Sequence, residues 1–162
     1  MQQDFSLGNI GKAESIILSE EFRELKDLTL DILRYIHEIE SYEIADKVKE
    51  YKKYKARIDD FFDIFLMWFR DILLLKADTS PNKDIARRKI IFKNEYISLR
   101  KQADKLKMDS IDYIINRINR ARIRIKSNVN FDAALELLIV EVKERIFNSK
   151  KAFSNSCIKE VK

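Results

Sequence analysis

This chain of 162 residues has little of what forms turns, crosslinks and metal sites. It contains two glycines, one proline, one cysteine and one histidine. A single cysteine, Cys157, excludes an internal disulfide framework and a cysteine-rich zinc site. Scarce glycine and proline favour long helices with short connections, because these two residues interrupt helices most strongly. Few segments alternate apolar and polar residues with a period of two, so we expect no sheet.

Motifs that bind phosphates or metals are also missing. Neither GxxxxGK[ST] nor GxGxxG occurs, and Gly8 and Gly11 lack the rest of either pattern. The histidine, His37, could join a carboxylate-bridged di-iron site only with a glutamate three residues earlier and a second histidine. Position 34 is arginine and there is no second histidine. We expect His37 to lie on the flank of a helix, and we expect neither a metal nor a cofactor.

A cluster of carboxylates, Asp59, Asp60 and Asp63, raises the question of acid–base chemistry. Such chemistry needs a cleft that moves two pKa values apart. Nothing in the sequence indicates a cleft, and a solvated helix edge explains the cluster. We therefore predict that the chain is not an enzyme and binds no small-molecule substrate.

Apolar residues recur at spacings of three and four, which predicts an all-α helical bundle of about six or seven helices. Ser19, Ser41, Asp109 and Asn130 are the expected N-caps. The predicted helices cover residues 8–18, 20–39, 41–55, 56–76, 94–106, 109–127 and 130–147. Residues 78–84 read as a loop, residues 85–93 show no clear period, and a frayed polar tail follows Asn148.

The segment 56–76, ARIDDFFDIFLMWFRDILLLK, is the most apolar helix. Asp63, Arg70 and Asp71 interrupt it, and the longest uncharged run covers only residues 64–69. A membrane span needs about 20 mostly apolar residues, so we expect a core helix and no membrane contact. Its aspartates and Arg70 are expected on one polar edge, with Trp68 on the apolar side.

The segment 116–126, NRINRARIRIK, is the strongest candidate for a binding surface from charge alone. The chain carries 32 basic and 27 acidic residues, a mild net charge of +5 that permits nucleic-acid contact without requiring it. Arg117, Arg120 and Arg124 line one flank of the apolar stripe, and Arg122 and Lys126 line the other. These side chains could contact phosphates, or their stems could cover the edge of a core. The second arrangement is the more common.

Three stretches in this order resemble the C-terminal part of the delta-prime subunit of the bacterial DNA polymerase III clamp loader. They are GNIGKA (8–13), WFRD (68–71) and NVNFDAALELLI (128–139), and the resemblance runs from about Ser6 to Phe147. Family members often have proline after the second asparagine, where this chain has Phe131. The motif residues, expected to be structural, are Gly8, Gly11, Trp68, Arg70, Asp71, Asn128 and Asn130.

The resemblance implies a domain organisation and a role. Residues 1–18 would end an AAA+ lid region, residues 19–148 would form a C-terminal helical collar domain, and residues 149–162 would be a polar tail. Collar domains join five subunits into a ring, and the loader places the sliding clamp on primed DNA with ATP bound by other subunits. Gly11 falls where an ATP-binding relative carries a sensor arginine, which fits a subunit that does not hydrolyse ATP.

The partners implied are the other clamp-loader subunits, with DNA contacted only indirectly, in the cytoplasm. Ile123 and Val140 lie off the main apolar stripes of their helices, and we expect them at a subunit interface. Two alternatives stay open. One is a small basic nucleic-acid-binding module that uses Arg117, Arg120 and Arg124, and the other is a helical adaptor for a protein outside replication.

Overall fold

The structure, a computed structural model, describes residues 20–79 and 84–157, and all of its regular elements are helical. The all-α prediction is therefore confirmed for this part of the chain. The helix predicted at 8–18, the cap at Ser19 and the motif glycines Gly8 and Gly11 lie outside the described residues. None of the described helices is both long and apolar enough to cross a membrane.

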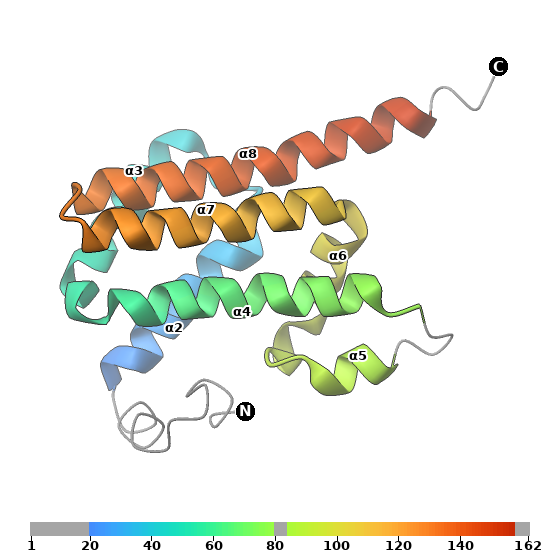
Figure 1. Cartoon of the computed structure of the whole chain (residues 1–162), viewed down its shortest axis with the longest axis horizontal. Coiled ribbons are helices and arrows are strands. Elements are labelled where there is room, and N and C mark those ends of the chain that lie inside the picture. Colours follow the sequence, from blue (N-terminus) through green and yellow to red (C-terminus); the bar gives the residue numbers. More distant parts are fainter. Residues whose placement is uncertain (1–19, 80–83, 158–162) are drawn as a thin grey trace.

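Seven α-helices and two 3₁₀ segments make up the described chain. In chain order they are α2 (Glu20–Tyr35), α3 (Ser41–Glu50), η2 (Tyr51–Arg57), α4 (Ile58–Ala77), α5 (Asp84–Lys89), η3 (Lys93–Glu95), α6 (Tyr96–Lys105), α7 (Met108–Lys126) and α8 (Phe131–Cys157). Helix α4 lies in the middle and contacts α2, α5, α6 and α7. Helices α7 and α8 run antiparallel beside each other, and α8 extends past the rest of the bundle (Figure 1).

Several predicted helix ends are wrong by a few residues. The N-caps of α3 and α7 are Glu40 and Lys107, not Ser41 and Asp109. At α3, the Glu43 carboxylate accepts the Glu40 N–H at 2.8 Å, so a glutamate in the first turn satisfies the donor outside the helix.

Larger differences occur where tertiary contacts override local pattern. The lysine-rich helix predicted to residue 55 tightens into η2, with a non-helical Tyr54 that is itself buried. Helix α2 ends at Tyr35 rather than near residue 39. The predicted tail is wrong from 149 to 157, because α8 continues to Cys157. The segment 85–93 holds the short helix α5.

Helix α4 forms the core, but its predicted polar edge is only partly right. Asp59, Asp63 and Arg70 lie on the accessible edge, as expected. Asp60 is only 9% exposed and Asp71 is completely buried. At 100° per residue, Asp60 and Asp71 point about 100° and 120° away from Asp59, which places them beside the apolar residues and not among the other charges.

The buried indole of Trp68 joins three helices through hydrogen bonds. Its Nε1 donates to the Gln102 side-chain oxygen of α6 at 3.0 Å. The Gln102 amide nitrogen in turn donates to the Leu33 carbonyl of α2 at 2.7 Å. Leu33 lies in the last turn of α2, where carbonyls have no partner inside the helix. One glutamine therefore satisfies a donor on α4 and an acceptor on α2.

The buried carboxylate of Asp71 holds the connection between α5 and η3. Its Oδ2 accepts the backbone N–H groups of Ile91 and Phe92 at 2.7 and 2.9 Å, and its Oδ1 lies 3.0 Å from the Arg70 guanidinium. Burial raises the pKa of this carboxyl, while the two backbone donors and Arg70 oppose that rise. The carboxylate thus orders a stretch of chain that has no helical pattern of its own.

Replacement of Gln102 by leucine should strongly destabilise the fold. The substitution keeps the side chain's approximate size but leaves the Trp68 N–H and the Leu33 carbonyl buried without partners. We expect a loss of about 2–5 kcal/mol in the free energy of unfolding, measured by urea denaturation followed by circular dichroism. The neighbouring exposed change Lys101→Ala should have little effect. Equal, small losses for both variants would show that the Gln102 hydrogen bonds contribute little.

Replacements of Asp71 should depend on whether an acceptor remains. Asp71→Ala removes the acceptor for two buried N–H groups and should cost about 2–4 kcal/mol of unfolding free energy. Asp71→Asn keeps a carbonyl oxygen and should cost clearly less. Asp46→Ala is the matched control, because Asp46 is exposed and pairs only with Lys49 of the same helix. A loss for Asp71→Asn as large as that for Asp71→Ala would contradict the assigned role of the acceptor.

Candidate interaction surface

The turn between α7 and α8 explains the first of the two motif asparagines. Asn128 adopts a left-handed conformation, with φ 59°, which asparagine tolerates better than most residues. Its N–H donates to the Ile125 carbonyl, and the Val129 N–H donates to the Arg124 carbonyl, each at 3.1 Å. These two bonds form a Schellman motif that closes the end of α7.

The second asparagine begins the next helix. Asn130 Oδ1 accepts the Ala133 N–H at 3.1 Å, so the predicted N-cap is confirmed. Phe131 takes the first helical position and lies half-buried, with the Lys55 ammonium 5.0 Å from its ring centre. Two asparagines separated by one residue thus end one helix and start the next. They reverse the chain sharply enough for α7 and α8 to pack side by side.

The predicted apolar stripes of α7 and α8 both face the core. The buried apolar residues are Ile111, Ile114, Ile118 and Ala121 on α7, and Ala134, Leu135, Leu138, Ile139, Val142 and Ile146 on α8. Ile123 points away from this core and is 64% exposed, as its place off the stripe predicted. Val140 is half-buried and packs against the core, so it is less accessible than Ile123.

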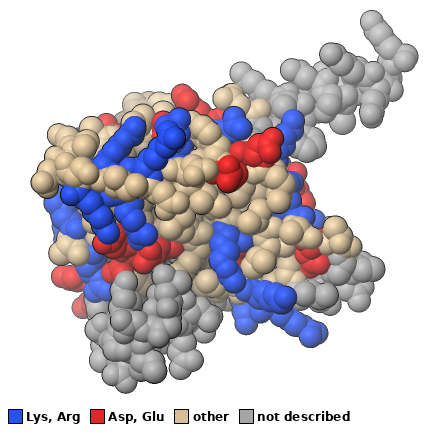
Figure 2. All heavy atoms as spheres, in the orientation of Figure 1, with Lys and Arg blue, Asp and Glu red and all other residues tan. Residues whose placement is uncertain are grey.

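A further apolar side chain on this side of the molecule is Leu137, which is 42% exposed. Leu137 was not among the interface residues predicted from the sequence. The available signal was an apolar residue on the polar side of α8, one turn from Val140. We use the name hairpin face for the outward side of α7 and α8 that carries Ile123, Leu137 and Val140. Figure 2 shows uncharged surface over these two helices, with basic side chains gathered towards the turn that joins them.

Much of the basic segment at 116–126 is neutralised within the chain. Arg122 pairs with Asp63 and, at 3.1 Å, with Asp59, and it donates to the Asp59 carbonyl at 2.8 Å. Lys126 lies 3.2 Å from Asp59. Arg117 lies 3.2 Å from Glu141 of α8. This half of α7 therefore docks on α4 and α8, as the more common of the two alternatives predicts.

Two arginines of the segment are not neutralised in this way. Arg120 is exposed and Arg124 half-buried, and neither forms an ion pair with the described residues. Both lie beside Ile123 on α7. An accessible isoleucine next to two uncompensated arginines is typical of protein interfaces, in which apolar and arginine side chains combine.

The α4 aspartates and His37, the other candidate site residues, do not form a catalytic or metal-binding cluster in the described part of the chain. Asp59 and Asp63 hold Arg122 and Lys126, and Asp60 lies 2.9 Å from Arg57. Across the described ranges, no cluster of three or more histidine, cysteine or acidic side chains could hold a metal ion. The expectation that His37 lies on a helix flank is wrong, because α2 ends at Tyr35 and His37 lies in the turn that follows.

Comparison with known proteins gives one weak similarity. The chain is 23% identical, over 139 residues, to the DNA polymerase III subunit delta' of Bacillus subtilis (strain 168). The match covers 84% of this chain and 40% of that protein, so the chain spans less than half of its relative's length. No family model matches, and no solved structure matches. The similarity supports, at a distance, a relationship to clamp-loader subunits.

The ion pairs lead to an expectation about DNA. On the flank formed by Arg117, Arg120 and Arg124, only the last two keep uncompensated charge, because Arg117 is paired with Glu141. Any DNA binding by the isolated chain should stay in the non-specific range of about 10⁻⁴ to 10⁻⁶ M at physiological salt. The α7 flank should contribute no more than about −2 to the slope of log affinity against log salt, because only two of its arginines are available. Fluorescence anisotropy with labelled duplex DNA measures both.

The double variant Arg120→Ala/Arg124→Ala should make the slope of log affinity against log salt shallower by about 2 and weaken any residual DNA binding. Arg88→Ala/Lys89→Ala on α5 is the control, since it removes the same charge from exposed positions elsewhere. A slope near −6 for the wild-type chain that becomes clearly shallower in the α7 double variant, but not in the α5 control, would instead support the basic module that uses Arg117, Arg120 and Arg124.

Proposed function

We propose that this chain is the non-catalytic assembly domain, or collar domain, of a delta-prime-type clamp-loader subunit. In this role it holds subunits together while the loader places the sliding clamp on primed DNA during replication. Residues 19–148 would form the collar domain, and residues 1–18 would belong to the end of an AAA+ lid region. The partners would be other clamp-loader subunits, with DNA contacted only indirectly.

The observation that carries the proposal is the exposure of apolar side chains on the hairpin face. The apolar stripes of α7 and α8 already face the core, yet Ile123 and Leu137 on the outward side are 64% and 42% exposed. Exposed apolar groups on two helices that pack against each other are candidates for an association site. The similarity to a DNA polymerase III subunit then indicates which partners to test.

The geometry of the hairpin favours a rigid docking surface. The Schellman motif and the Asn130 cap fix the turn, and the Arg117–Glu141 pair ties the two helices together farther along. Tyr113 of α7 adds a second tie, since the guanidinium groups of Arg117 and Arg145 lie 4.8 and 4.9 Å from its ring centre. A surface ordered before binding loses less conformational entropy when a partner docks.

Charged substitutions on the hairpin face test the proposal. Ile123→Asp and Leu137→Asp should each weaken association with the C-terminal helical domains of the other clamp-loader subunits by at least about tenfold in Kd. Size-exclusion chromatography and calorimetry on mixed subunits measure this. Val140 is a poorer test position, because it also packs against the core and a charge there would disturb folding.

Ile97→Asp is the matched control. Ile97 is 70% exposed, lies on α6, and is not part of the hairpin face. All three variants should keep the wild-type circular dichroism spectrum and melting temperature. Loss of assembly for Ile97→Asp but not for Ile123→Asp, or no assembly of the wild-type chain with any clamp-loader subunit, would overturn the proposal. Assembly with a protein outside replication would favour the adaptor alternative.

A further inference from the structure

A second surface lies where α2, α6 and the distal half of α8 meet. It is a pocket of about 300 Å³, near the lower limit of ordinary ligand sites. Its lining residues are Arg34, Tyr35, His37, Glu38, Ser98, Lys101, Gln102, Lys105 and Ile146. None of them belongs to the hairpin face, so the pocket is independent of the proposed assembly surface.

Basic groups outnumber acidic ones in this pocket, but they are not equivalent. Arg34 is already neutralised, since its guanidinium lies 2.6 Å from Glu95 and 2.5 Å from Asp31. Lys101 and Lys105 are exposed and form no ion pair with any described residue. They lie one turn apart on α6, so both ammonium groups can reach the same side of the helix.

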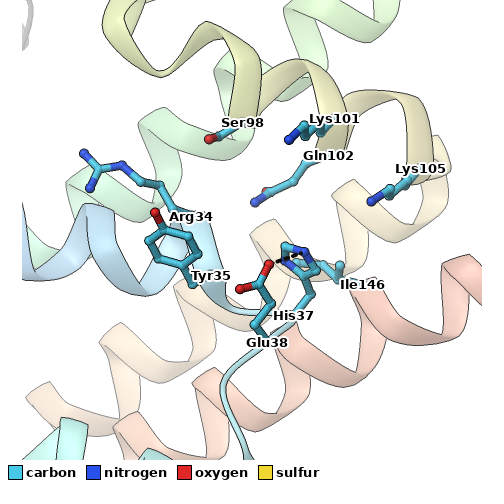
Figure 3. A pocket seen from close by; sticks show the side chains of 9 residues that line it. All are labelled: Arg34, Tyr35, His37, Glu38, Ser98, Lys101, Gln102, Lys105 and Ile146. Carbon is cyan, nitrogen blue, oxygen red and sulfur yellow. Dashed lines mark ion pairs between the residues drawn. The ribbon is translucent and has the colours of Figure 1, made fainter.

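The carboxylate among the lining residues, Glu38, lies across the pocket from the two lysines (Figure 3). Figure 3 shows Ser98, Lys101 and Lys105 along α6, with His37 and Glu38 across from them and Arg34 and Ile146 towards opposite ends. Glu38 Oε1 lies 3.3 Å from His37 Nε2. The pocket therefore offers two unpaired cations on one wall and a single acid, beside an imidazole, on the other.

The rest of the lining is suited to an apolar group. The Tyr35 ring is 53% exposed at the rim, and Ile146 is buried at the wall formed by α8. Gln102 lies at the base, but its amide is already engaged with Trp68 and Leu33. The Glu38 carboxylate in the lining would repel a doubly charged anion such as phosphate.

We infer that this pocket docks a short acidic segment of a protein partner, with one carboxylate between Lys101 and Lys105 and a neighbouring apolar side chain against Tyr35. Charge complementarity selects the acidic residue, and the exposed tyrosine provides the apolar contact area. Tyrosine is favoured at such positions because it combines a large apolar ring with a polar end. The inference holds whether or not the hairpin face joins clamp-loader subunits.

Selection from a random peptide library tests the docking site. Phage-displayed peptides are selected on the full chain and counter-selected against the variant Lys101→Glu/Lys105→Glu. The enriched peptides should contain at least one aspartate or glutamate next to an apolar residue. Synthetic versions are then measured by fluorescence anisotropy against the variants, with inorganic phosphate and ATP as competitors.

Three variants should affect peptide affinity differently: one should weaken binding, one should tighten it and one should leave it unchanged. Lys101→Glu/Lys105→Glu should weaken peptide binding by about tenfold or more, and added salt should weaken binding to the wild-type chain. Glu38→Gln removes the repelling acid and should tighten binding by about two- to fivefold. Arg88→Glu/Lys89→Glu on α5 makes the same change of net charge as the lysine double variant, away from the pocket, and should leave the affinity unchanged.

Several results would overturn the inference. They are the absence of enriched peptides, enrichment without acidic residues, equal losses for the α5 and α6 variants, and displacement of the peptide by phosphate or ATP at similar concentrations. The last result would identify a phosphate site in place of a peptide site. Ile123→Asp should bind the peptides normally, so failure here and failure of subunit assembly remain distinguishable.

Discussion

The fold depends on how two buried polar groups of α4 are satisfied. Helix α4 is covered on most sides, and an unpaired donor or charge there would be costly. The Trp68 N–H finds its partner on α6, through the same glutamine that binds the end of α2. The Asp71 carboxylate finds its partners at residues 91 and 92. Two residues three positions apart thus fix three neighbouring segments around one helix.

The remaining side of the core is closed by α7 and α8, and the way they close it determines what they expose. Arg122 and Lys126 anchor α7 to the acidic edge of α4, and Arg117 anchors it to α8. With both apolar stripes turned inward, Ile123 and Leu137 must face outward. The basic segment thus divides into cations that stabilise the fold and two arginines that stay available beside apolar side chains.

Two accessible surfaces of different character result. The hairpin face combines aliphatic side chains with Arg120 and Arg124 on a rigid pair of helices, and this combination suits the proposed assembly role. The pocket between α2, α6 and α8 is concave and carries Lys101 and Lys105 on one wall. Because the two surfaces share no residue, a chain of this size could join an assembly through one while it holds a peptide in the other.

The sequence by itself determined the helical class, the inward faces of the long helices and the Asn130 cap. These follow from local periodicity and first-turn chemistry, which depend on residues a few positions apart. Even the exposure of Ile123 could be predicted, since it lies off a clear stripe. The similarity to a clamp-loader subunit also came from short sequence motifs, and the comparison supports it only at a distance.

Only the tertiary structure decided which charges are buried and which side chains converge. Asp71 shares its helix with Asp59 and Asp63, which are only partly buried, and its burial depends on the chain at 91–92, which has no periodic pattern. The pocket unites residues from α2, α6 and α8, and those from α2 and α8 are more than a hundred positions apart; His37 joins them from the turn that follows α2. Such long-range pairings cannot be predicted from the spacing of apolar residues, because that spacing describes one helix at a time. The free-energy cost of burying a polar group depends on all of its neighbours together, and these come from several helices.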